Sequence, residues 1–145
     1  MKRTILYYCF ICLFMLSAGC EDNGINSENI SLAGNYDFVS MYEKNGQKTF
    51  FAGQPFIEGI ISVTMTGDLV LTDKNYSSNL RSIVTIGDQT DTVEITDHGT
   101  YQIIDDNTME CYSEENNETF QTSFLVEDDN LTVENDSTKM VWKKR

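Results

Sequence analysis

The sequence predicts an all-β fold, an antiparallel meander that closes as a small barrel, with a β-sandwich as the alternative. From Leu32 onward, apolar and polar residues alternate with a period of two, as in half-buried strands. Turn-forming residues separate these runs at short intervals. No helix-length window keeps the i, i+3, i+4, i+7 spacing of an amphipathic helix. Since open strand edges invite aggregation, such a meander closes on itself or packs as two sheets.

The composition fits one ordinary globular domain and excludes one class of partner. The chain has 145 residues, of which 40% are hydrophobic and 23% charged, and these fractions are typical of globular proteins. Ten Lys and Arg residues against 23 Asp and Glu residues give a formal net charge of −13. Because this charge repels a polyanion, we expect no nucleic-acid partner.

The first nineteen residues have the order of an export signal. Lys2 and Arg3 form a short positive start, and an uncharged apolar run covers 5–16. That run is shorter than the roughly 20 residues of a membrane-spanning helix, and it is typical of a signal peptide. Small residues at 17–19 then precede Cys20 and an acidic segment. The sequence therefore predicts a signal peptide over 1–19.

The segment Ser17-Ala18-Gly19-Cys20 resembles the lipobox of bacterial lipoproteins. The resemblance implies that Cys20 is the lipid attachment site, carrying acyl chains such as palmitate that anchor the protein in a membrane. The chain departs from the family at Ser17, where Leu is preferred. Glu21 follows Cys20 in place of the Asp that favours inner-membrane retention, so we expect the outer membrane of a bacterial cell envelope. The alternative is an ordinary secretory cleavage site.

Only one cysteine remains in the predicted mature body. Cys9 and Cys12 leave with the signal peptide, and Cys20 is the lipid site. Cys111 therefore has no disulfide partner, and stability must come from burial of apolar groups. Met109 and Cys111 fall on one face of a predicted strand, which favours a small buried hydrophobe over a reactive nucleophile.

A flexible acidic tether is predicted over 20–31, and one β domain over 32–145. The tether is rich in Asn, Asp, Glu, Ser and Gly and has too few apolar residues to fold. Within the domain, about ten strands are expected. The predicted turns between them are Asn45-Gly46, Gly53 to Pro55, Thr66-Gly67-Asp68, Gly87-Asp88, His98-Gly99, Asp105-Asp106-Asn107, Glu114 to Glu118, Glu127 to Asn130 and Asn135-Asp136.

Four segments of the predicted domain resemble the small lipocalin-like domains of bacterial lipoproteins. They are Leu32-Ala33-Gly34-Asn35-Tyr36-Asp37-Phe38-Val39-Ser40, Gly99-Thr100-Tyr101-Gln102-Ile103-Ile104, Asp129-Asn130-Leu131-Thr132-Val133 and Met140-Val141-Trp142-Lys143-Lys144. The resemblance implies a lipocalin-like barrel with an interior cavity. The chain departs at Tyr36, where the family has Trp. We expect Trp142, with Lys139 and Lys143 close by, to supply aromatic–cation packing there.

The residues offer little for catalysis or metal binding, so we expect no catalytic residue, no metal and no cofactor. His98 is the single histidine and lacks the setting of a catalytic triad. Zinc needs His or Cys ligands at close spacing, and the mature chain holds one of each. The acidic turns at 105–107 and 127–130 do not follow the spacing of a calcium loop. The sequence therefore predicts a protein that is not an enzyme.

Apolar residues that alternate along the predicted strands are the candidates to line the barrel interior. The candidate ligand-lining residues are Tyr36, Phe38, Phe51, Ile61, Val63, Met65, Leu69, Leu71, Tyr101, Ile103, Phe120, Phe124 and Trp142. The same residues are also expected if they only fill the core. The leading hypothesis is a lipid-anchored binding module for a small apolar ligand or an envelope protein. The alternative is a structural or surface-coat lipoprotein with a filled barrel and no ligand.

Overall fold

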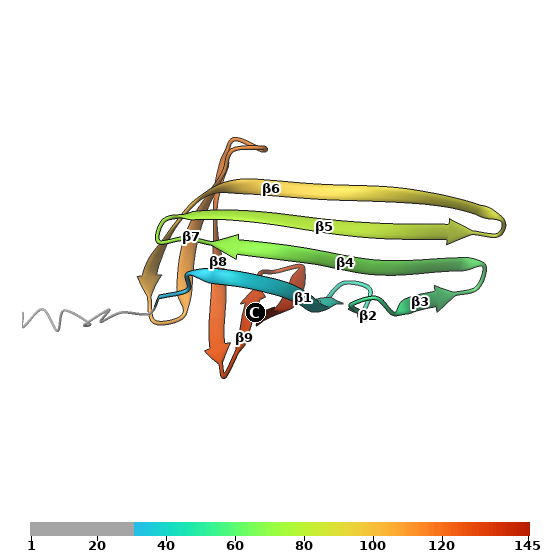
Figure 1. Ribbon diagram of the computed structural model, residues 1–145, viewed down its shortest axis with the longest axis horizontal. Helices are drawn as coiled ribbons and strands as arrows, with labels where there is room; N and C mark the ends of the chain where they lie inside the picture. Colours follow the sequence, from blue (N-terminus) through green and yellow to red (C-terminus); the bar gives the residue numbers. More distant parts are fainter. Residues whose placement is uncertain (1–30) are drawn as a thin grey trace, which may run out of the picture.

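The computed structural model describes residues 31–145, which form strands and the turns between them (Figure 1). The predicted signal peptide over 1–19, Cys20 and nearly all of the predicted tether over 20–31 lie outside the described residues. The ten strands are β1 (Gly34–Glu43), β2 (Lys48–Phe51), β3 (Pro55–Glu58), β4 (Ile61–Leu71), β5 (Asn75–Ile86), β6 (Gln89–Asp105), β7 (Thr108–Ser113), β8 (Glu118–Glu127), β9 (Asn130–Glu134) and β10 (Thr138–Lys144). The all-β prediction is confirmed.

Eight of these strands close into an antiparallel barrel, so the barrel prediction is confirmed over the sandwich. Neighbouring strands follow one another from β4 through β10 to β1, and β1 returns to pair with β4. Strands β2 and β3 lie outside this circle and pair with β1 and β4. Closure leaves no free edge along the barrel wall itself.

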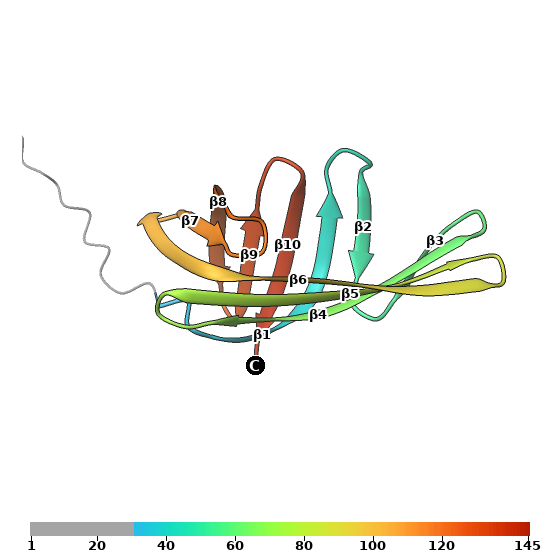
Figure 2. The ribbon, with the colours of Figure 1, turned by 90° about the horizontal axis from the view of Figure 1, so that it is seen from above.

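Strand β1 closes the barrel because it changes partner along its length. Its first half pairs with β4, from Gly34 opposite Leu71 to Asp37 opposite Asp68. Its second half, from Ser40 onward, pairs with β2. An irregularity between Phe38 and Ser40 interrupts its register with β10. Such a bulge bends a strand and increases its twist, and Figure 2 shows β1 curving from the base of the barrel up to β2.

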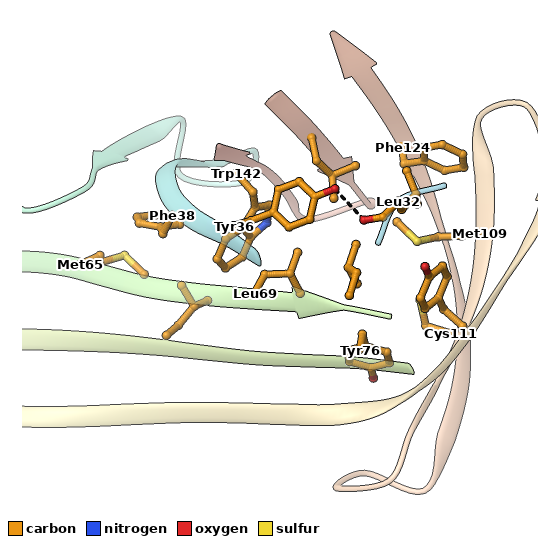
Figure 3. Close-up of a cluster of buried hydrophobic side chains, with 14 residues drawn as sticks. Leu32, Tyr36, Phe38, Met65, Leu69, Tyr76, Met109, Cys111, Phe124 and Trp142 are labelled. Carbon is orange, nitrogen blue, oxygen red and sulfur yellow. Dashed lines mark hydrogen bonds between the residues drawn. The ribbon is translucent and has the colours of Figure 1, made fainter. Parts of the chain in front are cut away.

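The core lies inside the barrel and is built from the inward-facing residues of the alternating pattern (Figure 3). The rings of Phe38 and Trp142 pack edge to face, with their centroids 5.6 Å apart. The Tyr36 hydroxyl donates a 2.6 Å hydrogen bond to the carbonyl oxygen of Leu32. The expected aromatic–cation contact is made differently: the ammonium of Lys144 lies 5.8 Å from the centroid of the Tyr36 ring. The sequence predicts a lysine beside the Trp142 ring, and the structure places a lysine beside the Tyr36 ring instead.

The outer parts of β3, β4, β5 and β6 extend past the barrel as a ribbon, here called the arm (55–64, 81–96; Figure 1). The register of β4 with β5 runs without interruption from the arm into the barrel wall, from Ile61 opposite Ile86 to Leu71 opposite Tyr76. The hairpin of β5 and β6 ends in the two-residue turn at Gly87, where φ is 59°. Glycine takes this left-handed conformation without strain.

Two predicted turns are wrong, because Thr66-Gly67-Asp68 lies inside β4 and His98-Gly99 lies inside β6. The glycines there serve close packing between strands. A Cβ at Gly67 would overlap the carbonyl oxygen of Asn79, and a Cβ at Gly99 would overlap that of Tyr112. A glycine within a strand often marks such a close approach of a neighbouring backbone.

Candidate ligand cavity

A cavity of about 210 Å³ lies inside the barrel, with walls contributed by seven consecutive strands, β4 to β10. Most of its lining is apolar, as in typical small-molecule sites. The lining residues are Leu69, Leu71, Tyr76, Ser78, Asp97, Tyr101, Met109, Cys111, Phe120, Thr122, Leu131, Val133, Asn135, Met140 and Trp142. Figure 3 shows Leu69, Tyr76, Cys111 and Met109 facing one another across part of this space.

Asp97 forms the centre of a hydrogen-bonded group on the cavity wall. The Tyr76 hydroxyl donates to Asp97 Oδ2 at 2.9 Å, and the Ser113 hydroxyl donates to Asp97 Oδ1 at 2.6 Å. The backbone N–H of Asn116 donates to the Ser113 oxygen at 3.2 Å, which orients the serine. Two neutral donors therefore hold the carboxylate in place, and no Lys or Arg is among the described residues that line the cavity.

Burial keeps the two tyrosine hydroxyls of the cavity in their donor form. Desolvation raises the pKa of Tyr76 well above its ordinary value, and the hydrogen bond to Asp97 raises it further. Desolvation likewise raises the pKa of Tyr101, whose hydroxyl donates to the carbonyl oxygen of Thr72 at 2.6 Å. A tyrosine hydroxyl is already neutral at physiological pH, and these shifts keep both groups protonated to still higher pH, so both act as donors.

Cys111 is a buried wall residue of the cavity, as its alternation with Met109 predicts. Burial raises the pKa of its thiol to about 11, and the negative charges of Asp97 and Glu110 add to this effect. The thiol is therefore protonated at neutral pH. A protonated, enclosed thiol is a poor nucleophile, so Cys111 contributes shape and apolar surface to the cavity.

A second hollow of about 420 Å³ adjoins the cavity, since Thr122 and Asn135 line both. Its lining is polar, unlike that of the cavity, and includes Lys44, Gln121 and Glu134. The Lys44 ammonium lies 2.7 Å from the Glu134 carboxylate and also donates to the carbonyl oxygen of Asn135.

The predicted lining residues separate into four groups. Leu69, Leu71, Tyr101, Phe120 and Trp142 line the cavity. Tyr36, Phe38, Met65 and Phe124 are buried in the core next to it, and Val63 and Ile103 pack half-buried against that core. Phe51 and Ile61 lie outside the barrel interior, with 51% and 40% of their surfaces exposed.

The two misplaced residues belong to segments that leave the barrel. Phe51 ends β2, which pairs with β1 outside the closed circle. On β2 the ring that packs is its neighbour Phe50, 4.9 Å from the ring of Phe56. Ile61 begins β4 at the far end of the arm. The alternation of apolar and polar residues shows which residues share a face of a strand. It does not show where that strand extends beyond the core.

Ten lining residues were absent from the predicted set, among them Asp97, Tyr76, Leu131 and Met140. Asp97 could not be singled out from the sequence, because it is one of 23 acidic residues and adjoins a predicted turn. Leu131 and Tyr76 could have been found, since each alternates in phase with residues that face inward. His98, which was predicted to occupy a turn, instead lies in β6 with its ring nitrogens 3.3 Å from Glu114 and 3.5 Å from Glu115.

The class of protein that these observations define is a closed antiparallel β-barrel with an interior cavity. No family model and no curated protein matches the chain. A crystal structure of an uncharacterized protein from Bacteroides eggerthii is similar to it, with a TM-score of 0.49 and 8% identity over 79% of this chain and 100% of that chain. Residues 31–145 contain no helix long and apolar enough to cross a bilayer, and no group of three or more His, Cys, Asp or Glu placed to hold a metal ion.

Proposed function

We propose that this protein is a non-enzymatic, lipid-anchored binding protein of the bacterial cell envelope, whose lipocalin-like barrel takes up a small ligand. The observation that carries the proposal is the apolar cavity of about 210 Å³ with the Asp97 carboxylate on its wall. An apolar site with a few convergent polar groups is the usual form of a small-molecule site. The cavity supports this function over the alternative of a structural barrel with a filled interior.

The lining points to a ligand with an apolar body and one hydrogen-bond donor. Met109, Leu131 and Trp142 offer apolar surface to the body of the ligand. Both oxygens of Asp97 accept one hydrogen bond each from the protein, and a carboxylate oxygen has a second lone pair. A hydroxyl or an amine fits this acceptor, whereas a carboxylate-ended ligand is repelled by it.

Native mass spectrometry of the soluble 21–145 form, with and without membrane extract, tests whether the cavity is occupied. We expect an added mass after incubation with extract. Val133→Phe replaces a small aliphatic side chain of the cavity wall with an aromatic ring and should abolish the added mass, since the space is about 210 Å³. Leu125→Phe, at a position 51% exposed on β8, is the matched control. An equal added mass on both variants, or none on the unsubstituted protein, would contradict the proposal.

The membrane anchor rests on Cys20, and its removal should change the location of the protein. We expect Cys20→Ala to abolish acyl labelling and to release or mislocalise the protein, because the acyl chains are the proposed source of retention. Metabolic labelling with a palmitate analogue, followed by fractionation, measures both effects. The control is Cys111→Ala, which removes a buried thiol of the barrel and should leave labelling unchanged. Unchanged labelling of Cys20→Ala would remove the lipoprotein proposal and leave the cavity proposal standing.

A further inference from the structure

One strand edge of the arm has no neighbour among the described residues. Strand β6 pairs with β5 along its length from Gln89 to Thr100. On its other side, β7 begins to pair only at Gly99. The outer edge of β6 therefore lies open from Gln89 to Asp97, at the top of the arm in Figure 1. An open edge presents unpaired N–H and C=O groups and is a template for another strand.

Two hydrogen bonds at the barrel end of β6 establish which residues face this open edge. The N–H of Glu114 on the β7 side donates to the carbonyl oxygen of His98, so His98 points away from β5. The N–H of Tyr101 donates to the carbonyl oxygen of Lys74, which lies on the β5 side. Because backbone groups alternate along a strand, the even-numbered residues present their donors and acceptors to the edge. These residues are Thr90, Thr92, Glu94 and Thr96.

The arm also exposes apolar side chains beside this edge. Val93 and Ile95 are 45% and 56% exposed. In the register, Ile95 lies opposite Leu80, which is buried in the barrel core. The exposed residues therefore continue the inward face of the barrel beyond its rim. A partner strand at the edge would cover both the open backbone groups and the flanks of these side chains.

We propose that a second copy of this chain pairs with the open edge, β6 against β6 in antiparallel orientation about a two-fold axis. A register that uses the whole edge places Gln89 opposite Asp97 of the partner subunit. That register centres on Val93, which then lies opposite Val93 of the partner subunit. The two copies bring the same surface to the contact, as a two-fold interface requires.

The charges along the strand favour this register over its neighbours. When Val93 is the centre, Asp91 lies opposite Ile95 and Glu94 lies opposite Thr92 of the partner subunit, so no two carboxylates are directly opposed. A centre at Glu94 places that carboxylate against its own copy, which is destabilising. A centre at Thr92 leaves Asp97 without a strand residue opposite it. The register with the longest pairing is thus also one that avoids like-charge contact.

Disulfide trapping in cells that express the full chain tests this interface. At the centre, the α-carbons of the two Val93 residues would be within the range that a disulfide spans, because antiparallel residues directly opposite one another lie about 4.5–5.5 Å apart. We expect Val93→Cys to give about tenfold more linked dimer on mild oxidation than Leu125→Cys, since pairing holds the two sulfurs together. Leu125 lies on β8 of the barrel wall and is similarly exposed. The unsubstituted chain sets the background from its own cysteines.

A second variant shows whether strand pairing causes the link. Thr92→Pro removes an N–H that faces the open edge, and an edge strand tolerates proline at such a position. In the Val93→Cys chain, this change should reduce the linked dimer to the level of Leu125→Cys. Resistance of the buried Cys111 to alkylation shows that the barrel of each variant is folded. Two results would overturn the proposal. One is an amount of linked dimer from Val93→Cys no greater than that from Leu125→Cys, and the other is an amount that Thr92→Pro does not reduce.

Discussion

Trp142→Ala should lower the free energy of unfolding by about 3–5 kcal/mol, the usual cost of removing a large aromatic side chain from a core. Trp142 is 3% exposed, packs edge to face on Phe38 and lines the ligand cavity. The substitution removes the indole and enlarges a space that is already present. The barrel has little room to collapse around it, because β10 is held between β9 and β1. Urea unfolding followed by circular dichroism measures the change.

Val126→Ala is the matched control for this prediction. Val126 also lies in a barrel strand, but 48% of its surface is exposed, so its truncation should change the free energy of unfolding by less than about 0.5 kcal/mol. Trp142→Phe should lower the free energy of unfolding by more than Val126→Ala and by less than Trp142→Ala, because it keeps a ring against Phe38. Equal effects of Trp142→Ala and Val126→Ala would contradict the placement of Trp142 in the core.

Gly99→Ala should destabilise the protein by about 1–3 kcal/mol or more, the range for overpacking a close-packed site. Gly99 is buried where β6 meets β7, and an added Cβ would overlap the carbonyl oxygen of Tyr112. That atom is backbone and cannot move without displacing β7. The same Cβ would lie 3.3 Å from the Tyr76 ring, so we also expect weaker binding of any ligand that contacts Asp97.

Gly46→Ala separates this steric effect from the general effect of replacing glycine. At Gly46 an added Cβ would meet only the flexible end of the Glu43 side chain, at 3.1 Å. Its substitution should therefore leave the unfolding midpoint nearly unchanged. Thermal unfolding of the two variants side by side measures the difference. A Gly99→Ala midpoint equal to that of Gly46→Ala would contradict the close packing of β6 on β7.

The barrel strands could be predicted from the sequence because burial there follows a strict alternation. Tyr36 and Phe38 face inward on either side of Asp37, and Leu131 is inward on β9. The predicted turns at Gly67 and Gly99 failed for a different reason. Glycine is required both for tight turns and where two backbones approach closely, and a single sequence does not distinguish the two.

The strand pairing that closes the barrel, the arm and the polar group of the cavity could not be predicted, although the closed barrel itself was. Closure depends on Gly34 meeting Leu71, a contact between remote segments that leaves no local pattern. The arm has the same alternation as the barrel strands, so the sequence pattern places Ile61 in the interior although it lies outside. Asp97 becomes distinctive only when the fold brings Tyr76 and Ser113 to its two oxygens.

Cross-strand nuclear Overhauser effects between β1 and β4 test the central claim of a closed barrel around an interior cavity most directly. Closure predicts contacts between backbone protons of Asn35 and Val70 and of Tyr36 and Leu69, which are paired in the register, because opposed residues of antiparallel strands lie about 4.5–5.5 Å apart. Contacts of β1 with β2 and β10 alone, and none with β4, would mean an open sheet and would contradict the account.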